Sequence, residues 1–331
     1  MDDRGLRRKK AAAGAAGEQV QAVSGGKPPD TVGGGEKPPG TQTAAAATGG
    51  EVLVAQGVYT ENVRLPGFVH LVGGLLPGQG TQTRDPERYP SVVDANRLGA
   101  ALVAASGHRV SGLDGMTLRN GIGAPVGLAR QGGGLYCASA SPEVLGCVIT
   151  GNVAGLGGGL YGEGCDIVVR RSRLTVNRSF GSGGAAFLNG GATVFSDLTL
   201  ADNIAGGTGG GLCLVDASPD LLRNQFLRNT SLQGYGGGLY ASGPGRLRGS
   251  LFASNTAAQG SGALLQAGKD QVLAVSNNTL GANVGGAALT LSLADGSIVS
   301  LVNNIVAFNP AGVFADHPIT ARNNDVFGNT G

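Results

Sequence analysis

Two sequence markers recur through most of this chain at a nearly constant interval. The first is a glycine cluster followed by an apolar residue, found as GGGLY at 132–136, GGGLY at 157–161, GGAAF at 183–187, GGGLC at 209–213, GGGLY at 236–240 and, weakened, SGALL at 261–265. The second is an apolar residue three positions before an asparagine, in the pairs Ile149/Asn152, Leu174/Asn177, Leu200/Asn203, Phe226/Asn229, Phe252/Asn255, Leu280/Asn283, Val306/Asn309 and Val326/Asn329. Both markers step mostly by 25 or 26 residues, so they belong to one repeated structural unit.

The content of each unit predicts strands rather than helices. Runs of three to five apolar or β-branched residues alternate with Gly or Asn, and no long segment has the helical period. One unit of about 25 residues can hold two or three short strands, but it cannot bury its inner face alone. Stacked coils solve this, because each strand pairs in parallel with its equivalent about 4.8 Å away. We therefore predict an all-β, right-handed parallel β-helix, the hand following from the preferred crossover.

The repeat assigns a structural role to each conspicuous position. One inward stack is expected at Leu135, Leu160, Ala186, Leu212, Leu239 and Leu264. The asparagines of the second marker should occupy equivalent turns, where amides hydrogen-bond from coil to coil and tolerate left-handed backbone. A second turn ladder is expected five residues earlier, at Cys147, Ser172, Leu198, Asn224, Ser250, Asn278, Asn304 and Asn324.

Composition divides the chain into a tail and one extended domain. The segment 24–43, SGGKPPDTVGGGEKPPGTQT, cannot pack a core and is typical of a linker. We assign residues 1–50 to a disordered tail ending in a degenerate N-terminal cap, TAAAATGG at 43–50, and residues 51–331 to the β-helix. The basic run at 7–10 is followed by small residues and by Glu18, which makes a poor signal peptide.

Charge and hydropathy restrict the partners. Twenty-four basic and 22 acidic residues leave a formal net charge of +2, too little to indicate a nucleic acid or an anionic membrane surface. No run of 18 apolar residues is present, so no transmembrane helix is expected. The last coil ends one or two residues after a repeat asparagine, and its open edge is a candidate for self-association.

Several segments resemble a known family. The stretch GGGLYCASASPEVLGCVITGN at 132–152 is similar to the repeat unit of right-handed parallel β-helix proteins of the pectin-lyase-like superfamily. The Gly-Gly and Phe-x-x-Asn pattern, at 226–229 and 252–255, also resembles polymorphic outer-membrane protein repeats. Segments 51–74, 83–95 and 114–121 look like coils of the same proteins. The resemblance implies an extracellular or cell-envelope location, whereas the fold hosts both enzymes and binding proteins.

The four cysteines fall at ordinary repeat positions, which favours structural roles. Cys137 follows an inward Leu by two residues and Cys147 lies in the second turn ladder, so both are expected as buried free thiols. Cys165 and Cys213 also fit the repeat. No Cys-x-x-Cys or His-x-x-x-His spacing is present, so the sequence indicates no metal site.

One group of charged residues is a candidate catalytic site. A calcium-dependent polysaccharide lyase needs three or four oxygen ligands and a basic side chain that removes a proton beside a carboxylate. Asp197 and Asp202 lie on one coil, whereas Asp166, Arg171 and Arg173 lie on the preceding one. The five-residue step between the first two, and the different phase of Asp166, suit scattered surface carboxylates equally well.

A column of aromatic residues is the candidate binding site. Tyr136, Tyr161, Phe187 and Tyr240 directly follow the inward stack, in phase with Cys213 and Leu265, so they should point outward about 4.8 Å apart. Sugar rings stack on aromatic faces, but stacked rings can also simply cover a sheet. Two hypotheses follow. The first is a non-enzymatic secreted or cell-surface scaffold that binds polysaccharide without a cofactor; the alternative is a pectate-type lyase that uses Ca²⁺.

Overall fold

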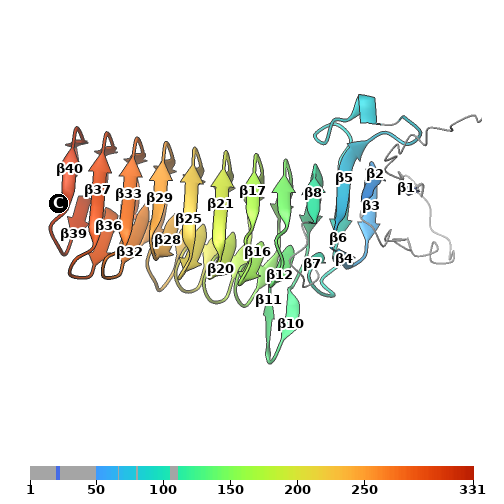
Figure 1. Cartoon of the computed structure of the whole chain (residues 1–331), viewed down its shortest axis with the longest axis horizontal. Coiled ribbons are helices and arrows are strands. Elements are labelled where there is room, and N and C mark those ends of the chain that lie inside the picture. The colour runs from blue at the N-terminus through green and yellow to red at the C-terminus, as the bar shows by residue number, and fades with distance from the viewer. Residues whose placement is uncertain (1–19, 23–49, 66, 80, 105–110) are drawn as a thin grey trace, which may run out of the picture.

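The computed structural model describes residues 20–22, 50–65, 67–79, 81–104 and 111–331. They form a parallel β-solenoid whose coils stack along the long axis of the molecule (Figure 1). Equivalent inward residues follow one another at steps of 24 to 27 residues, from Leu135 to Leu160 and onward to Val313. The predicted all-β parallel β-helix is confirmed.

Three long parallel sheets form the walls of the solenoid. The twelve-stranded sheet contains β1 (Val20–Ala22), β2 (Gly50–Ala55), β5 (Val69–Leu75), β8 (Gly112–Asp114), β13 (Glu143–Leu145), β17 (Val168–Arg170), β21 (Ala192–Ser196), β25 (Ser218–Leu222), β29 (Gly245–Arg248), β33 (Val272–Ser276), β37 (Ile298–Val302) and β40 (Thr320–Arg322). The eleven-stranded sheet contains β3 (Gly57–Thr60), β6 (Ser91–Asp94), β9 (Met116–Arg119), β14 (Val148–Thr150), β18 (Arg173–Thr175), β22 (Thr199–Ala201), β26 (Gln225–Leu227), β30 (Leu251–Ala253), β34 (Thr279–Gly281), β38 (Ile305–Ala307) and β41 (Asp325–Phe327). The ten-stranded sheet contains β4 (Val63–Leu65), β7 (Leu102–Ala104), β12 (Leu135–Ala138), β16 (Leu160–Glu163), β20 (Ala186–Asn189), β24 (Leu212–Val215), β28 (Leu239–Ser242), β32 (Ala263–Ala267), β36 (Ala287–Leu293) and β39 (Ala311–Ala315).

Shorter elements complete the coils. A six-stranded sheet contains β15 (Val153–Ala154), β19 (Arg178–Ser179), β23 (Ile204–Ala205), β27 (Thr230–Ser231), β31 (Thr256–Ala257) and β35 (Val284–Gly285). One coil thus runs through β12, β13, β14 and β15 before the chain returns to β16. Two insertions leave this path: a loop with a 3-10 turn, η1 (Thr81–Thr83), and an antiparallel hairpin of β10 (Ala124–Val126) and β11 (Ala129–Gln131), which projects from the body (Figure 1).

Two sharp corners flank each strand of the eleven-stranded sheet. In coil after coil the residue at each corner has a left-handed φ, as at Arg171 and Val176, or Asp197 and Asp202. The buried ladder residue comes directly after it. The left-handed position therefore precedes each ladder asparagine, instead of being the asparagine itself as the sequence suggested. The corner side chains line up in two columns, which we call the first corner column (with Arg171) and the second corner column (with Val176).

The buried asparagines form the predicted ladders. Asn203 donates its Nδ2 to Asn229 Oδ1 at 2.9 Å and to Leu174 O at 2.9 Å. Its own Oδ1 accepts from the backbone N and the Nδ2 of Asn177, at 3.0 and 3.1 Å. The second ladder works in the same way, for example from Leu198 N to Asn224 Oδ1 at 3.1 Å. Each buried amide is thus paired from coil to coil, and the ladder fixes the stacking register.

The core is one continuous apolar column inside the coils. Each wall strand alternates between inward and outward residues, so the sheets bury Leu135, Val144 and Ile149 in one coil and their register partners in the next. Phe226 and Phe252 stack within the column, with ring centroids 4.4 Å apart. The predicted inward stack is correct except at its end, where Ala263 occupies the place expected for Leu264. Leu264 instead pairs with Tyr240, because Gly260 takes the left-handed corner equivalent to Gly236 and shortens this step to 24 residues.

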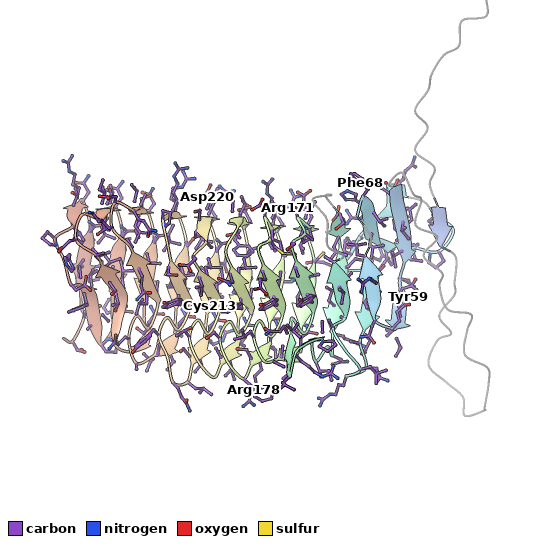
Figure 2. The ribbon with its side chains drawn as sticks, turned by 60° about the horizontal axis from the view of Figure 1, so that its bottom comes forward. Tyr59, Phe68, Arg171, Arg178, Cys213 and Asp220 are labelled. Carbon is purple, nitrogen blue, oxygen red and sulfur yellow. A yellow bond between two sulfur atoms is a disulfide. The ribbon has the colours of Figure 1, made fainter. Side chains whose placement is uncertain are left out.

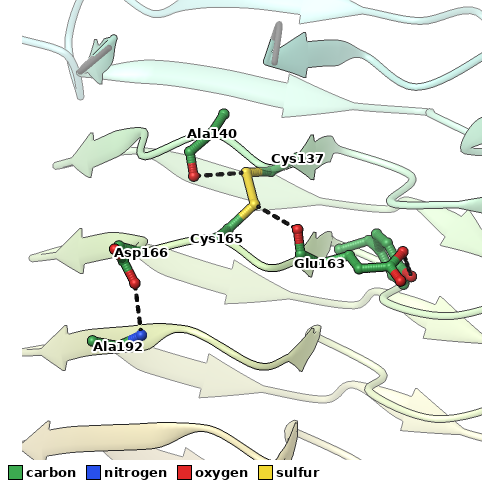
Figure 3. The surroundings of a disulfide bond; sticks show 7 residues. Cys137, Ala140, Glu163, Cys165, Asp166 and Ala192 are labelled. Atoms are coloured by element: carbon green, nitrogen blue, oxygen red, sulfur yellow. Dashed lines mark hydrogen bonds between the residues drawn. A yellow bond between two sulfur atoms is a disulfide. The ribbon is translucent and has the colours of Figure 1, made fainter. Parts of the chain in front are cut away.

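One expectation about the cysteines is wrong. Cys137 is bonded to Cys165, whereas Cys147 and Cys213 are buried free thiols (Figure 3). Cys137 lies opposite Gly162 in the next coil, and a Cβ added to Gly162 would come within 3.5 Å of Cys165 Cβ. The missing side chain at Gly162 therefore leaves room for the Cys165 sulfur. Repeat spacing matches Cys137 with Gly162, three residues short of its true partner.

Most of the predicted tail lies outside the described residues, including the basic run, the linker and the cap. Within it, Val20–Ala22 (β1) pairs in parallel with β2, which itself starts at Gly50. At the other end, β39, β40 and β41 are the edge strands of the three long sheets. No helix in the described part of the chain has the length and hydropathy needed to cross a membrane.

Candidate functional site

A hollow of about 380 Å³ lies where the insertion between β5 and β6 meets the outer face of the eleven-stranded sheet. The insertion is tied to the coils by an ion pair between Arg84 and Asp114, and by Arg173 Nη2, which lies 3.2 Å from Glu87 Oε1. We call this site the insertion hollow. The lining residues that carry its polar chemistry are Glu87, Thr117, Arg171, Arg173, Asp197 and Thr199.

Strand register positions the floor of the insertion hollow. Thr117, Val148, Arg173 and Thr199 are direct partners on β9, β14, β18 and β22. Each points outward because its neighbour in the strand, such as Leu174, is buried in the core. The floor therefore repeats at the coil spacing of about 4.8 Å along the solenoid axis.

The first corner column forms the rim of the hollow. Arg171 and Asp197 are both at left-handed corners, and both contribute to the lining. Asp197 is held by Arg223 of the next coil in a two-point ion pair, with Nε–Oδ1 at 2.7 Å and Nη2–Oδ2 at 3.0 Å. These hydrogen bonds lower the pKa of Asp197 below its ordinary value. Its carboxylate is consequently ionised and accepts hydrogen bonds, which does not suit a general acid.

The other predicted catalytic residues lie elsewhere. Asp202 belongs to the second corner column, where Arg228 pairs with it at 2.7 and 2.8 Å and lowers its pKa. Asp166 lies beyond the disulfide, where its Oδ1 accepts from Ala192 N at 2.8 Å (Figure 3). The structure thus brings together Arg171, Arg173 and Asp197. Among the residues that it describes, no group of three or more His, Cys, Asp or Glu side chains could hold a metal ion.

The aromatic column has the predicted order on the ten-stranded sheet. Tyr136, Tyr161 and Phe187 are register partners on β12, β16 and β20, and Tyr240 follows on β28 after Cys213. The first three rings stack nearly parallel, with successive centroids 5.6 Å apart and interplanar angles of 3° and 8°. The column ends at Leu264 rather than Leu265, because of the shortened coil.

Stacking within the column limits what it can bind. Both faces of the Tyr161 ring are covered by neighbouring rings, and this residue is only 5% exposed. Its hydroxyl donates to Glu163 Oε2 at 2.9 Å, and the Tyr240 hydroxyl donates to Gln266 Oε1 at 2.6 Å. Burial raises the pKa of both tyrosines, so the hydroxyls stay protonated. The column therefore presents ring edges and hydroxyls, and its role as a sugar-stacking strip stays a prediction.

Sequence reasoning missed part of the hollow. Glu87, Thr117 and Thr199 contribute to it but were not predicted as site residues. The insertion could have been suspected from the polar, Pro-rich segment RDPERYP at 84–90, which interrupts the coil pattern. No sequence signal indicates that Glu87 reaches Arg173, because 86 residues separate them.

The chain matches no protein-family model, and no curated protein sequence matches it. Among solved structures it is similar to PfbA, a surface adhesin of Streptococcus pneumoniae, with 14% identity, a TM-score of 0.45 and coverage of 86% of this chain and 85% of the adhesin. Tailspike protein 3 of bacteriophage CBA120 is similar over 83% of this chain and 56% of the tailspike, with 12% identity and a TM-score of 0.35. These similarities concern the fold alone.

Proposed function

We propose that this chain is a non-enzymatic surface scaffold that binds a glycan in the insertion hollow, without a metal or other cofactor. The observation that carries the proposal is the row of outward hydrogen-bonding side chains, Thr117, Arg173 and Thr199, repeated along the solenoid axis beside a hollow. A rigid row at constant spacing suits an elongated ligand that lies parallel to that axis.

The chemistry of the lining matches sugar hydroxyls. A hydroxyl both donates and accepts, so a site that recognises it needs groups of both kinds. The guanidinium of Arg171 donates, the carboxylate of Asp197 accepts, and the threonine hydroxyls do either. A volume of about 380 Å³ falls within the roughly 300–1,000 Å³ common for small-ligand sites.

The alternative is a calcium-dependent lyase, favoured by the meeting of Arg171, Arg173 and Asp197 in one hollow. Two observations support the binding scaffold instead. Asp197 is committed to Arg223, and Asp202 to Arg228 in the other corner column. A calcium site would have to break these pairs and gather carboxylates from separate columns.

We also propose an extracellular or cell-envelope location and a place among the pectin-lyase-like β-helix proteins. The buried disulfide between Cys137 and Cys165 supports the location, because such bonds persist mainly in oxidising compartments. The similarity of the repeats to that superfamily, and to polymorphic outer-membrane protein repeats, supports the second proposal. Self-association through the edge formed by β39, β40 and β41 stays a prediction.

A glycan array combined with a lyase assay tests the proposal. The parent should bind a subset of glycans, and Thr117→Val with Thr199→Val should weaken that binding severalfold. The matched control is Thr230→Val with Thr256→Val, a pair on the six-stranded sheet outside the hollow, which should bind like the parent. Absorbance from unsaturated sugar products, if it appears with Ca²⁺ and disappears in Asp197→Ala with Asp202→Ala, would replace the scaffold proposal by the lyase. Absence of glycan binding by the parent would end it.

A further inference from the structure

A second hollow, of about 440 Å³, lies under the projecting hairpin. Its walls come from β11, from the second corner column and from the first strands of the six-stranded sheet. We call it the hairpin groove, and the lining residues used below are Arg97, Asn120, Arg130, Gly151, Val153 and Phe180. Arg171 of the insertion hollow and Arg178, which neighbours the hairpin groove, lie at opposite edges of the solenoid in Figure 2. The two hollows are therefore separate sites.

The hairpin is fixed to the body, so the groove has a rigid wall. Gly155 N donates to Arg130 O at 2.6 Å, and Gln131 forms a parallel bridge with Leu156. The Arg130 side chain is oriented by a bond from Nη1 to Gly123 O at 3.2 Å. A guanidinium has five N–H donors, so most of those of Arg130 remain available to a ligand.

The groove is basic. Arg97 and Arg130 line it, and Arg178 extends it as the register partner of Val153 in the next coil. None of these three arginines forms an ion pair with a residue in the described part of the chain. No carboxylate is among the lining residues. Asp94, which is bonded to Asn120 behind the groove, is already paired with Arg119 at 2.8 Å. The unbalanced charge favours an anionic occupant.

An aromatic ring closes one end of the groove. Phe180 is 69% exposed, and the Arg178 guanidinium lies 5.8 Å from its centroid. Unlike the rings of the aromatic column, Phe180 has no aromatic neighbour among the described residues, so a ring face can contact the C–H groups of a sugar. From the coil of Arg97 to that of Phe180 the groove crosses three coil steps, which is about 14 Å at about 4.8 Å each.

We propose that the hairpin groove binds an anionic glycan, with carboxylate or sulfate groups held by Arg97 and Arg130 and a sugar ring placed against Phe180. The inference rests on the proposed glycan-binding function and adds a second site with its own ligand class. Arginine suits both anions because its planar donors match two oxygens at once. The formal net charge of only +2, and the confinement of the free arginines to a short groove, favour a glycan over a nucleic acid, which needs many phosphate contacts.

Calorimetric titration of the full chain with a heparin octasaccharide at low salt tests the proposal. Arg97→Gln with Arg130→Gln should weaken binding at least tenfold, and Phe180→Ala should weaken it severalfold. Arg246→Gln with Arg322→Gln removes the same charge from exposed positions of the twelve-stranded sheet, and this control should bind within about twofold of the parent. Desulfated and carboxyl-reduced octasaccharides then show which anion the groove holds. A neutral maltodextrin should not bind.

Several outcomes would overturn this assignment. They are equal binding by the Arg97→Gln, Arg130→Gln variant with its melting temperature unchanged, equal weakening in the control variant, or displacement by an oligonucleotide of the same charge at the same concentration. If the array shows other glycans binding while the parent ignores all anionic ones, the hairpin groove assignment fails and the proposed function stands. If no glycan binds, both fail.

Discussion

The buried asparagines show how much a single side chain controls in a solenoid. Asn203 has no exposed surface, yet its amide makes bonds to both adjacent coils. A polar group in a dry interior is tolerated only when it is paired, and here the pairing also sets which residue lies above which. A ladder position thus specifies register as well as stability.

We predict that Asn203→Ala lowers the free energy of unfolding by about 2–4 kcal/mol. The change leaves the Asn177 amide donors and Leu174 O without partners, and each unpaired buried group costs roughly 1–3 kcal/mol. Urea unfolding measures the effect. Asn189→Ala, at an exposed strand end, is the control and should change stability by less than about 0.5 kcal/mol. Equal effects of the two changes would contradict the role assigned to the ladder.

The stacked ring of Tyr161 should affect stability more than glycan binding. Tyr161→Ala should cost about 2–4 kcal/mol, because a nearly buried ring leaves a cavity between two others. Tyr161→Phe keeps the stack and loses only the bond to Glu163, at about 0.5–1.5 kcal/mol. Thermal melting and the glycan array, run on both variants, check this. Full stability of Tyr161→Ala together with lost glycan binding would instead support a sugar-stacking strip.

At the scale of elements, the links between coils decide how the surface is used. The corner columns carry side chains out to solvent at a fixed spacing, so charges on successive coils meet. Asp197 and Arg223 in one column, and Asp202 and Arg228 in the other, are such meetings. The disulfide is a covalent version of the same link, joining β12 to the turn after β16.

Removing the disulfide should lower stability by about 3–4 kcal/mol, the entropic expectation for a bridge between residues 28 apart. The variant Cys137→Ala with Cys165→Ala, compared with the parent in denaturant, measures the loss. Thiol titration of the unfolded parent, produced in an oxidising compartment, should find two free thiols without reductant and four with it. Four thiols without reductant would show that the bond does not form.

The two corner ion pairs should make the protein acid-sensitive in a defined way. Because Arg223 and Arg228 lower the pKa values of Asp197 and Asp202, these carboxylates add stability above their unfolded pKa of about 3.9. That contribution is lost as the pH falls through the lower folded-state values. Melting temperatures of the parent should therefore drop on acidification below pH 4 by more than those of Asp197→Asn with Asp202→Asn. Parallel curves for the two proteins would contradict the proposed coupling.

At the scale of the whole molecule, each coil contacts only its neighbours in the stack. The core is a long column, so damage in one coil should spread to nearby coils and fade with distance. This differs from a compact domain, in which a core defect is felt everywhere.

Phe226→Asp should unfold the coils around it while the first coils stay folded. Phe226 is fully buried and stacked on Phe252, so a carboxylate there would have no partner. Hydrogen exchange should show lost protection in β22, β26 and β30 and retained protection in β5 and β8. Gln225→Asp, the exposed neighbour, is the control and should leave exchange unchanged. Uniform loss of protection along the chain would argue for one cooperative unit.

The sequence by itself determined the parts of this protein that repeat. Periodic markers predicted the parallel coils, most of the inward stack and both ladders, because every coil must satisfy the same packing and hydrogen-bonding conditions. The exceptions, Ala263 and the bond from Cys137 to Cys165, fall where one coil departs from that spacing.

Only the tertiary structure decided the candidate sites, because they depend on what breaks the repeat. The insertion places Glu87 beside Arg173, and the hairpin places Arg130 in a groove with Arg97 and Phe180. It also showed that Asp197 and Asp202 face different columns, although five residues separate them. Periodicity constrains backbone position and burial, whereas a binding site needs side chains from distant segments to meet, and no local pattern encodes those meetings.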